Sequence, residues 1–97
     1  MWILQGAGRH GDSLTFRLRP GAVKTVGRAP RADFIVDAAL VSRLHCRLEA
    51  GDDNLDVIDL SSTNGTYVNG KRVDRARLAS GDRLRVGRVE LKVEKQV

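Results

Sequence analysis

The chain has 97 residues, and 17 lysines and arginines against 12 aspartates and glutamates give a formal net charge of +5 at pH 7. This length suits a single hydrophobic core, so we expect residues 1–97 to form one domain. The one cysteine, Cys46, excludes an intramolecular disulfide framework, and two histidines cannot complete a zinc site of cysteines and histidines. The positive charge favours anionic partners: a phosphorylated or acidic peptide, nucleic acid or acidic lipid.

The N-terminus does not look like a targeting segment. Residues 1–5 lack the basic region and long apolar run of a signal peptide. No apolar stretch approaches the roughly 18–20 residues that span a bilayer, so no membrane association is expected. Without disulfides, the expected location is intracellular: cytoplasmic, or nuclear in a eukaryote. A strand that begins at Met1 favours a domain at the start of its native chain, and a larger multidomain protein could continue past Val97.

The apolar residues are spaced for short β-strands, because they mostly alternate with polar ones and never follow a sustained helical period. Leu14, Phe16 and Leu18 show this alternation clearly. We predict strands, in chain order, over residues 1–5, 13–19, 23–27, 33–36, 44–50, 55–60, a short segment ending at 68, 71–73, 83–86 and 89–94. Residues 74–78 are predicted to be a connection.

Turn signals separate the predicted strands. Asn69-Gly70 is the strongest, because both residues tolerate the positive φ of a type I′ turn, and Gly87-Arg88 is predicted to form a type II′ turn. About eleven short strands spaced by about 8–12 residues predict an all-β sandwich of two antiparallel-rich sheets. Loops cluster at the ends of such a sandwich and form natural binding surfaces there.

Three predicted loops carry groups that can surround an anion: Arg28 in one, Ser42 in the next, and Thr63 with Asn64 in the third. If these loops converge, a guanidinium, two hydroxyls, an amide and backbone N–H groups would bind a dianionic phosphate. Each signal alone fits a plainer interpretation. Arg28 could be a surface arginine, Ser42 a loop serine, and Asn64-Gly65 a tight turn with left-handed geometry.

Taken together, the motifs resemble the forkhead-associated (FHA) domain over nearly the whole chain. The matching segments, in order, are Gly27-Arg28, Pro30, Asp33–Asp37, Val41-Ser42-Arg43-x-His45, Asp59–Thr66, Val68-Asn69-Gly70 and Leu78-x-x-Gly81-Asp82-x-Leu84-x-Val86-Gly87. The resemblance implies an FHA-like sandwich that binds phosphothreonine peptides through loops at one end. The chain would then be a signalling adaptor without cofactor or metal, and a serine/threonine kinase would prepare its partner.

The resemblance also implies roles for individual residues. Arg28, Ser42 and Thr63 would contact the phosphate, and Asn64 and Arg43 would hold the peptide backbone. Structural support of the site would come from Gly27, His45, Gly65 and Asn69. Selectivity beyond the phosphate would come from Arg31, Leu40 and Val41. The small, uncharged loop around Leu40 favours an aliphatic ligand residue, whereas Arg31 and Arg43 would favour an acidic one, and the sequence leaves both open.

Two other binding functions stay open. A phospho-independent protein–protein or homo-oligomerisation module would use a sheet face in place of the loops. Nucleic-acid binding is suggested by the net charge of +5. It is disfavoured because Trp2, Phe16 and Phe34 are predicted to be core residues, which leaves no platform for base stacking.

Catalysis is not expected. A nucleophile–base pair would have to combine Cys46 or a serine with His45 or His10. The alternation of residues 44–50 predicts that Cys46 points inward and His45 outward, so these neighbours cannot cooperate.

Overall fold

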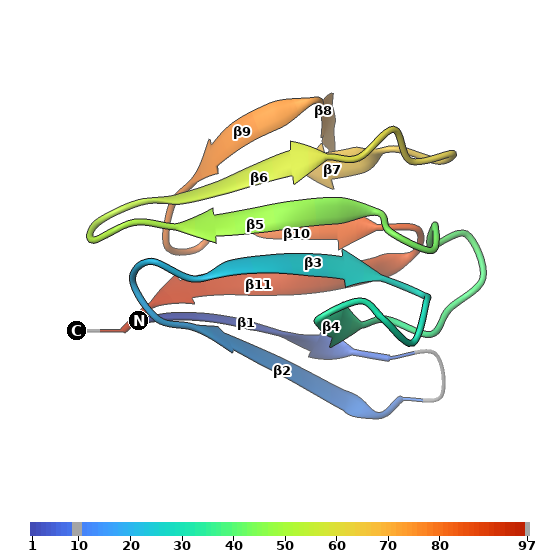
Figure 1. Ribbon diagram of the computed structural model, residues 1–97, viewed down its shortest axis with the longest axis horizontal. Coiled ribbons are helices and arrows are strands. Elements are labelled where there is room, and N and C mark those ends of the chain that lie inside the picture. The colour runs from blue at the N-terminus through green and yellow to red at the C-terminus, as the bar shows by residue number, and fades with distance from the viewer. Residues whose placement is uncertain (9–10, 97) are drawn as a thin grey trace.

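The computed structural model describes residues 1–8 and 11–96. This part of the chain contains β-strands and no helix, and the strands form two sheets (Figure 1). The predicted all-β sandwich of about eleven strands is thereby confirmed. The eleven strands of the described residues are β1 (Trp2–Ala7), β2 (Ser13–Leu18), β3 (Val23–Gly27), β4 (Phe34–Ile35), β5 (Cys46–Ala50), β6 (Leu55–Asp59), β7 (Thr66–Val68), β8 (Lys71–Val73), β9 (Arg75–Leu78), β10 (Arg83–Val86) and β11 (Val89–Lys95).

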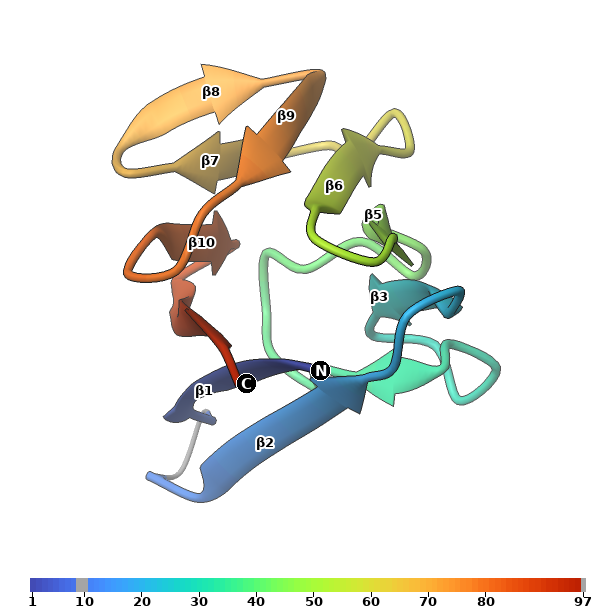
Figure 2. The ribbon, with the colours of Figure 1, turned by 90° about the vertical axis from the view of Figure 1, so that its left-hand side faces the viewer.

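The two sheets face each other, as the end-on view of Figure 2 shows. The strand order is β2-β1-β11-β10-β7-β8 in one sheet and β4-β3-β5-β6-β9 in the other. The pairs with a recorded register are antiparallel except for β3 and β4, which run parallel. In the first sheet, Leu4 lies between Phe16 on β2 and Val93 on β11. Residues opposite one another share a face of the sheet, so this register directs all three side chains toward the core.

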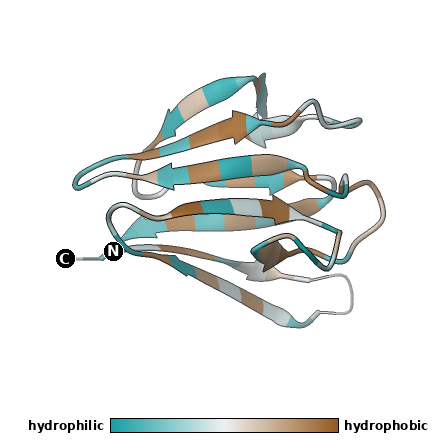
Figure 3. Ribbon diagram, viewed as in Figure 1, coloured by the Kyte–Doolittle hydropathy of each residue, from teal (hydrophilic) through white to brown (hydrophobic). Residues whose placement is uncertain are grey.

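The core lies between the sheets and takes alternate residues from each strand. In β11, Val89, Leu91 and Val93 are buried, whereas Glu90 and Lys92 are exposed. The same alternation gives the banded colouring of the strands in Figure 3. Fully burying one such aliphatic side chain contributes about 1.5–3 kcal/mol. The largest fully buried aliphatic side chains come from both sheets and include Leu4, Leu18, Leu48, Leu55, Leu84 and Leu91.

The predicted aromatic core residues differ in their burial. Trp2 is buried, as predicted. Phe16 and Phe34 are only half-buried and stack on each other, with ring centroids 4.6 Å apart. They lie on β2 and β4, which are edge strands of their sheets. Because an edge strand has a neighbour on one side only, these two rings close the rim of the core.

Two local predictions were wrong. Residues 74–78 are not a plain connection, because residues 75–78 form β9, which pairs with β6. The alternate residues Ala76 and Leu78 of this strand pack on the core. His45 was predicted to point outward, but it is completely buried. It precedes β5, so the strand alternation does not apply to it. His10 and Val97, which entered the sequence predictions, lie outside the described residues.

The predicted hairpin turns agree with the backbone. Asn69 and Gly70 have φ of 51° and 82°, which confirms the type I′ turn between β7 and β8. Gly87 has φ of 59° and Arg88 is not among the positive-φ residues, which is the type II′ pattern. The β10–β11 turn lies at the same end of the sandwich as the loops that follow β3, β4 and β6 (Figure 1).

Candidate functional site

The loops at this end of the sandwich border a groove of about 1060 Å³. Segments far apart in the sequence meet there, because adjacent strands of both sheets end at the same rim (Figure 1). The predicted site residues that line the groove are Arg28, Leu40, Val41, Ser42, Thr63 and Asn64. The structure therefore brings together the three loops that the sequence singled out.

Arg28 follows β3 and is exposed at the groove. Its backbone N–H donates to the carbonyl of Ser42 at 3.0 Å, and its Nε donates to the carbonyl of Val41 at 3.1 Å. Among the described residues, no hydrogen bond or ion pair involves the two terminal guanidinium nitrogens. The inner nitrogen thus fixes the side chain while the outer two can form the fork that binds an oxyanion.

Gly27 lets two backbones approach closely beside Arg28. A Cβ at this position would lie 2.0 Å from the carbonyl oxygen of Arg43, a distance that no real side chain tolerates. That carbonyl also accepts a hydrogen bond from the Ala29 N–H at 3.0 Å. The absence of a side chain therefore allows the loop carrying Ser42 to lie against the end of β3.

Ser42 connects two of the loops. Its Oγ accepts a hydrogen bond from the backbone N–H of Thr63 at 3.0 Å. Because the hydroxyl is the acceptor in this bond, its own proton can still be donated to an anion. Thr63 is exposed, and its hydroxyl has no hydrogen-bond partner among the described residues. Two hydroxyl donors therefore border the same groove as the Arg28 guanidinium.

Asn64 connects the same loops at a second point. Its Nδ2 donates to the carbonyl of Leu40 at 3.1 Å. Leu40 has φ of 75°, a left-handed conformation that is costly for a residue with a side chain. Leu40 is 46% exposed, so it offers an apolar surface to the groove.

His45 lies behind the groove and is completely buried. Its Nδ1 is 3.0 Å from the backbone N–H of Ser42, and its Nε2 is 2.8 Å from the carbonyl of Gly65. An N–H can only donate and a carbonyl can only accept, so the ring must be the neutral tautomer with its proton on Nε2. Gly65 has φ of 89°, which favours glycine at this corner. His45 thus connects the two loops from below.

Sequence reasoning missed the carboxylate that shapes the β6–β7 loop. Asp59 accepts hydrogen bonds from the Ser62 hydroxyl (2.5 Å), the Ser62 N–H (3.1 Å) and the Thr66 hydroxyl (2.7 Å). Burial alone would raise the pKa of the Asp59 carboxyl, but these hydrogen bonds outweigh it and lower that pKa below its ordinary value. The Asp-x-x-Ser spacing is the sequence signal that could have found this turn.

Three of the remaining predicted residues do not line the groove, whereas Val41, named above, lines it with little exposed surface. Arg31 and Arg43 are exposed, but neither lines the groove. Val41 is buried, so it forms part of the groove wall but offers little surface to a ligand. Asn69 lies at the far end of β7, where its side-chain amide bonds to Asp82 and to the backbone N–H of Arg83. It therefore joins the β7–β8 hairpin to β10.

Cys46 is unsuited to catalysis. Burial raises the pKa of its thiol to about 12, and the nearby Asp59 carboxylate adds to the effect. The thiolate is the nucleophilic form, so at neutral pH this thiol stays unreactive.

Within residues 1–8 and 11–96, no group of three or more His, Cys, Asp or Glu could hold a metal ion. The same residues contain no helix that is long and apolar enough to cross a bilayer.

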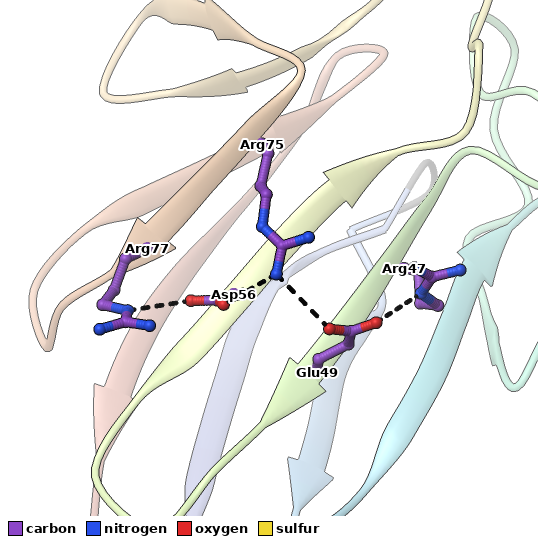
Figure 4. Close-up of polar contacts among 5 residues, drawn as sticks. All are labelled: Arg47, Glu49, Asp56, Arg75 and Arg77. Carbon is purple, nitrogen blue, oxygen red and sulfur yellow. Dashed lines mark hydrogen bonds and ion pairs between the residues drawn. The ribbon is translucent and has the colours of Figure 1, made fainter.

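The outer face of the five-stranded sheet carries a second charged surface (Figure 4). Arg47 pairs with Glu49 at 2.9 Å, Arg75 lies between Glu49 and Asp56, and Arg77 bonds to Asp56 at 3.1 Å. The hydrogen bond from Arg77 and a weaker one from Arg75 hold the pKa of Asp56 below its ordinary value against the effect of burial. Carboxylates thus alternate with arginines on this face, unlike the continuous basic patch typical of nucleic-acid binding.

Comparison with known proteins gives consistent matches. A family model described as the FHA domain matches residues 24–87. The glycogen accumulation regulator GarA of Mycobacterium tuberculosis is 40% identical to the chain over 70 residues, which are 72% of this chain and 43% of GarA. The chain therefore spans less than half the length of this relative.

Two solved FHA domains extend the likeness to almost the whole chain. One, from a study of phosphothreonine-dependent FHA domain interactions, has a TM-score of 0.87 and 34% identity, and the match covers 99% of this chain and 97% of that one. The other is the FhaA FHA domain in complex with the intracellular domain of Rv3910, with a TM-score of 0.85, 35% identity and coverage of 97% and 100%. The family model covers more than half of the chain and the fold agrees with it, so the chain belongs to the FHA domain family.

Proposed function

We propose that this chain binds phosphothreonine in a partner protein through the groove at the loop end of the sandwich. The observation that carries the proposal is the arrangement around Arg28. Its two terminal guanidinium nitrogens are available while Val41 holds Nε, and the hydroxyls of Ser42 and Thr63 lie in the same groove. A dianionic phosphate needs several donors at one point, and this groove offers a guanidinium fork and two hydroxyls.

The proposal assigns roles to individual residues. Arg28, Ser42 and Thr63 contact the phosphate oxygens, and each charge-assisted hydrogen bond contributes about 1.5–3 kcal/mol before the costs of binding. Asn64 and Arg43 hold the peptide backbone beside the phosphothreonine. For Asn64 the support is its place in the groove, where its Nδ2 already holds the Leu40 carbonyl. For Arg43 the support is its place next to Ser42 in the sequence.

We further propose that residues 1–97 form one non-catalytic FHA domain within a larger cytoplasmic protein. The length of GarA, of which the chain matches 43%, supports a larger protein. The name of GarA describes a regulator, and the FhaA FHA domain was solved in complex with an intracellular domain. A binding module whose partner is phosphorylated by a serine/threonine kinase agrees with both.

The test is a titration of the domain with a library of phosphothreonine peptides, followed by fluorescence anisotropy. The same peptides carrying phosphoserine or no phosphate, and random DNA, serve as comparison ligands. We expect binding only with phosphate, and Arg28→Ala and Ser42→Ala should each remove most of the affinity while the domain stays folded. Equal affinity for phosphorylated and unphosphorylated peptides would support the phospho-independent module. DNA binding that depends steeply on salt and is unchanged by Arg28→Ala would support nucleic-acid binding.

A further inference from the structure

A second arginine lines the groove besides Arg28. Arg88 belongs to the two-residue turn between β10 and β11, and the sequence assigned it no role beyond that turn. In the structure it lies at the groove together with Leu40. The turn joins strands of the six-stranded sheet, whereas Arg28 follows β3 in the other sheet. The groove therefore has a cationic side chain from each sheet.

Gly87, the residue before Arg88, packs against the segment 40–41, to which the side chain of Arg28 is hydrogen-bonded. A Cβ on Gly87 would lie 3.0 Å from Cγ2 of Val41 and 3.1 Å from the carbonyl carbon of Leu40, so the turn is in close contact with that segment. The carbonyl of Val41 accepts the hydrogen bond from Nε of Arg28. Both arginines are thus positioned against the same short segment, 40–41.

Arg88 differs from the other arginines of its hairpin. Arg83 pairs with Glu90 at 3.1 Å, and Arg85 stacks on the ring of Tyr67 at 4.2 Å. Arg88 is exposed, and within the described part of the chain no carboxylate forms an ion pair with it. Its positive charge is therefore available to a ligand in the groove.

The remaining charge at the groove is Asp37. It also borders a second hollow of about 290 Å³, whose lining includes Asp12 and the partly exposed Leu14 and Ile35. The ionisable side chains that line the groove are then Arg28 and Arg88 with Asp37, and the two arginines outnumber the single carboxylate. Arg28 is assigned to the phosphate, so Arg88 is the cation that remains for a neighbouring residue of the ligand.

We propose that Arg88 is a specificity-determining residue that favours an aspartate or glutamate close in sequence to the phosphothreonine. This inference rests on the proposed function. The aliphatic part of the acidic residue would lie on the exposed side chain of Leu40 while its carboxylate pairs with Arg88. Exposed ion pairs are weak, so Arg88 would rank phosphopeptides by about 2- to 5-fold and would not replace the phosphate contacts. An acidic preference would then come from Arg88, because Arg31 does not line the groove and Arg43 is assigned to the peptide backbone.

The experiment measures affinity for sets of phosphothreonine peptides that carry glutamate, alanine or lysine at one flanking position at a time. We expect the wild-type domain to prefer glutamate over lysine by about 2- to 5-fold at one position at least. Arg88→Ala should abolish this preference, and Arg88→Glu should reverse it. Arg83→Ala, in the same hairpin but outside the groove, is the matched control and should keep the preference.

The outcomes separate this inference from the proposed function. If phosphothreonine peptides bind but glutamate and lysine are equivalent at every position, the role of Arg88 is wrong and the phosphate site stands. The same holds if Arg88→Glu retains the preference for glutamate. If no phosphothreonine peptide binds, the proposed function fails and this inference fails with it.

Discussion

The backbone N–H of Ser42 donates to Nδ1 of His45 at 3.0 Å, so a completely buried imidazole holds the loop that carries Ser42. On the other side of the ring, Nε2 is 2.8 Å from the carbonyl of Gly65 in the β6–β7 loop. The same two loops are joined above the ring by the bond from the Thr63 N–H to Ser42 Oγ. The position of these two hydroxyls therefore depends on a neutral ring inside the protein.

Replacing His45 with alanine should weaken both folding and binding. The change leaves the N–H of Ser42 and the carbonyl of Gly65 without their partner, and a buried polar group left unpaired costs about 1–3 kcal/mol. We expect the free energy of unfolding to fall by about 2–4 kcal/mol, measured by urea denaturation. Phosphopeptide affinity should fall as well, because Ser42 loses its support.

Two conservative variants separate the two hydrogen bonds of His45. An asparagine can place its amide oxygen near the position of Nδ1 and accept from Ser42, whereas a glutamine can reach toward Gly65 and donate. We expect His45→Asn to retain more phosphopeptide affinity than His45→Gln at a comparable loss of stability. Equal affinities for the two variants would show that the bond to Ser42 does not position the phosphate site.

Arg28→Lys tests whether the guanidinium fork matters beyond its charge. Lysine keeps the positive charge but has no Nε to donate to the Val41 carbonyl and cannot bind two oxygens in one plane. Losing one charge-assisted bond of about 1.5–3 kcal/mol corresponds to about a 10- to 100-fold loss of phosphopeptide affinity in a fluorescence titration. Stability should fall by no more than about 1 kcal/mol, because the one hydrogen bond lost, to the Val41 carbonyl, is only part-buried. Arg17→Lys on the exposed face of β2 is the control, and wild-type affinity for Arg28→Lys would mean that charge alone suffices.

Gly27→Ala tests the close backbone approach at the end of β3. The added Cβ would lie 2.0 Å from the Arg43 carbonyl oxygen, and a backbone atom cannot move aside as a flexible side chain can. We expect the free energy of unfolding to fall by about 3 kcal/mol, since forcing extra atoms into a packed site costs about 1–3 kcal/mol or more. Gly8→Ala is the matched control, because its Cβ would have ordinary contacts of 3.5 Å or longer. Equal stability of the two variants would contradict this role for Gly27.

Much of the fold could be predicted from the sequence, because alternation and turn chemistry are local. The bounds of β3, β8 and β10 agree with the prediction to the residue, and Asn69-Gly70 forms the predicted type I′ turn. A strand with one buried face has a period of two residues that shows directly in the sequence. The alternation of β9 extends over only four residues, so a local pattern could not distinguish it from a connection.

The parts of the site that were missed depend on contacts between distant segments. Nothing near His45 in the sequence indicates that Gly65 will lie 2.8 Å from its Nε2 and make burial favourable. Arg88 was read only as part of a turn, because its place at the groove arises when Gly87 packs on Leu40. Asp59 was part of a recognised motif, but its partners become clear only when the loop closes on its carboxylate.

Asp59 should make the domain sensitive to acid. Hydrogen bonds from Ser62 and Thr66 lower the pKa of its carboxyl in the folded state below the ordinary value of 3.8. A carboxyl with a lowered folded pKa contributes stability that is present above the unfolded pKa and is lost as the pH falls through the folded pKa. The contribution of Asp59 should therefore be complete at neutral pH and disappear below about pH 4.

The variant Asp59→Asn isolates this contribution. Its amide has the shape of the carboxylate but not the charge, so at pH 7 the variant should be less stable than the wild type by about 1–3 kcal/mol. Urea denaturation at a series of pH values should show this difference shrinking as the pH falls below about 4, because the wild-type carboxyl is then protonated. Asp52→Asn, at an exposed position in the β5–β6 turn, should follow the wild-type curve throughout. A gap between wild type and Asp59→Asn that stays constant down to the acid limit would show that the charge of Asp59 does not stabilise the loop.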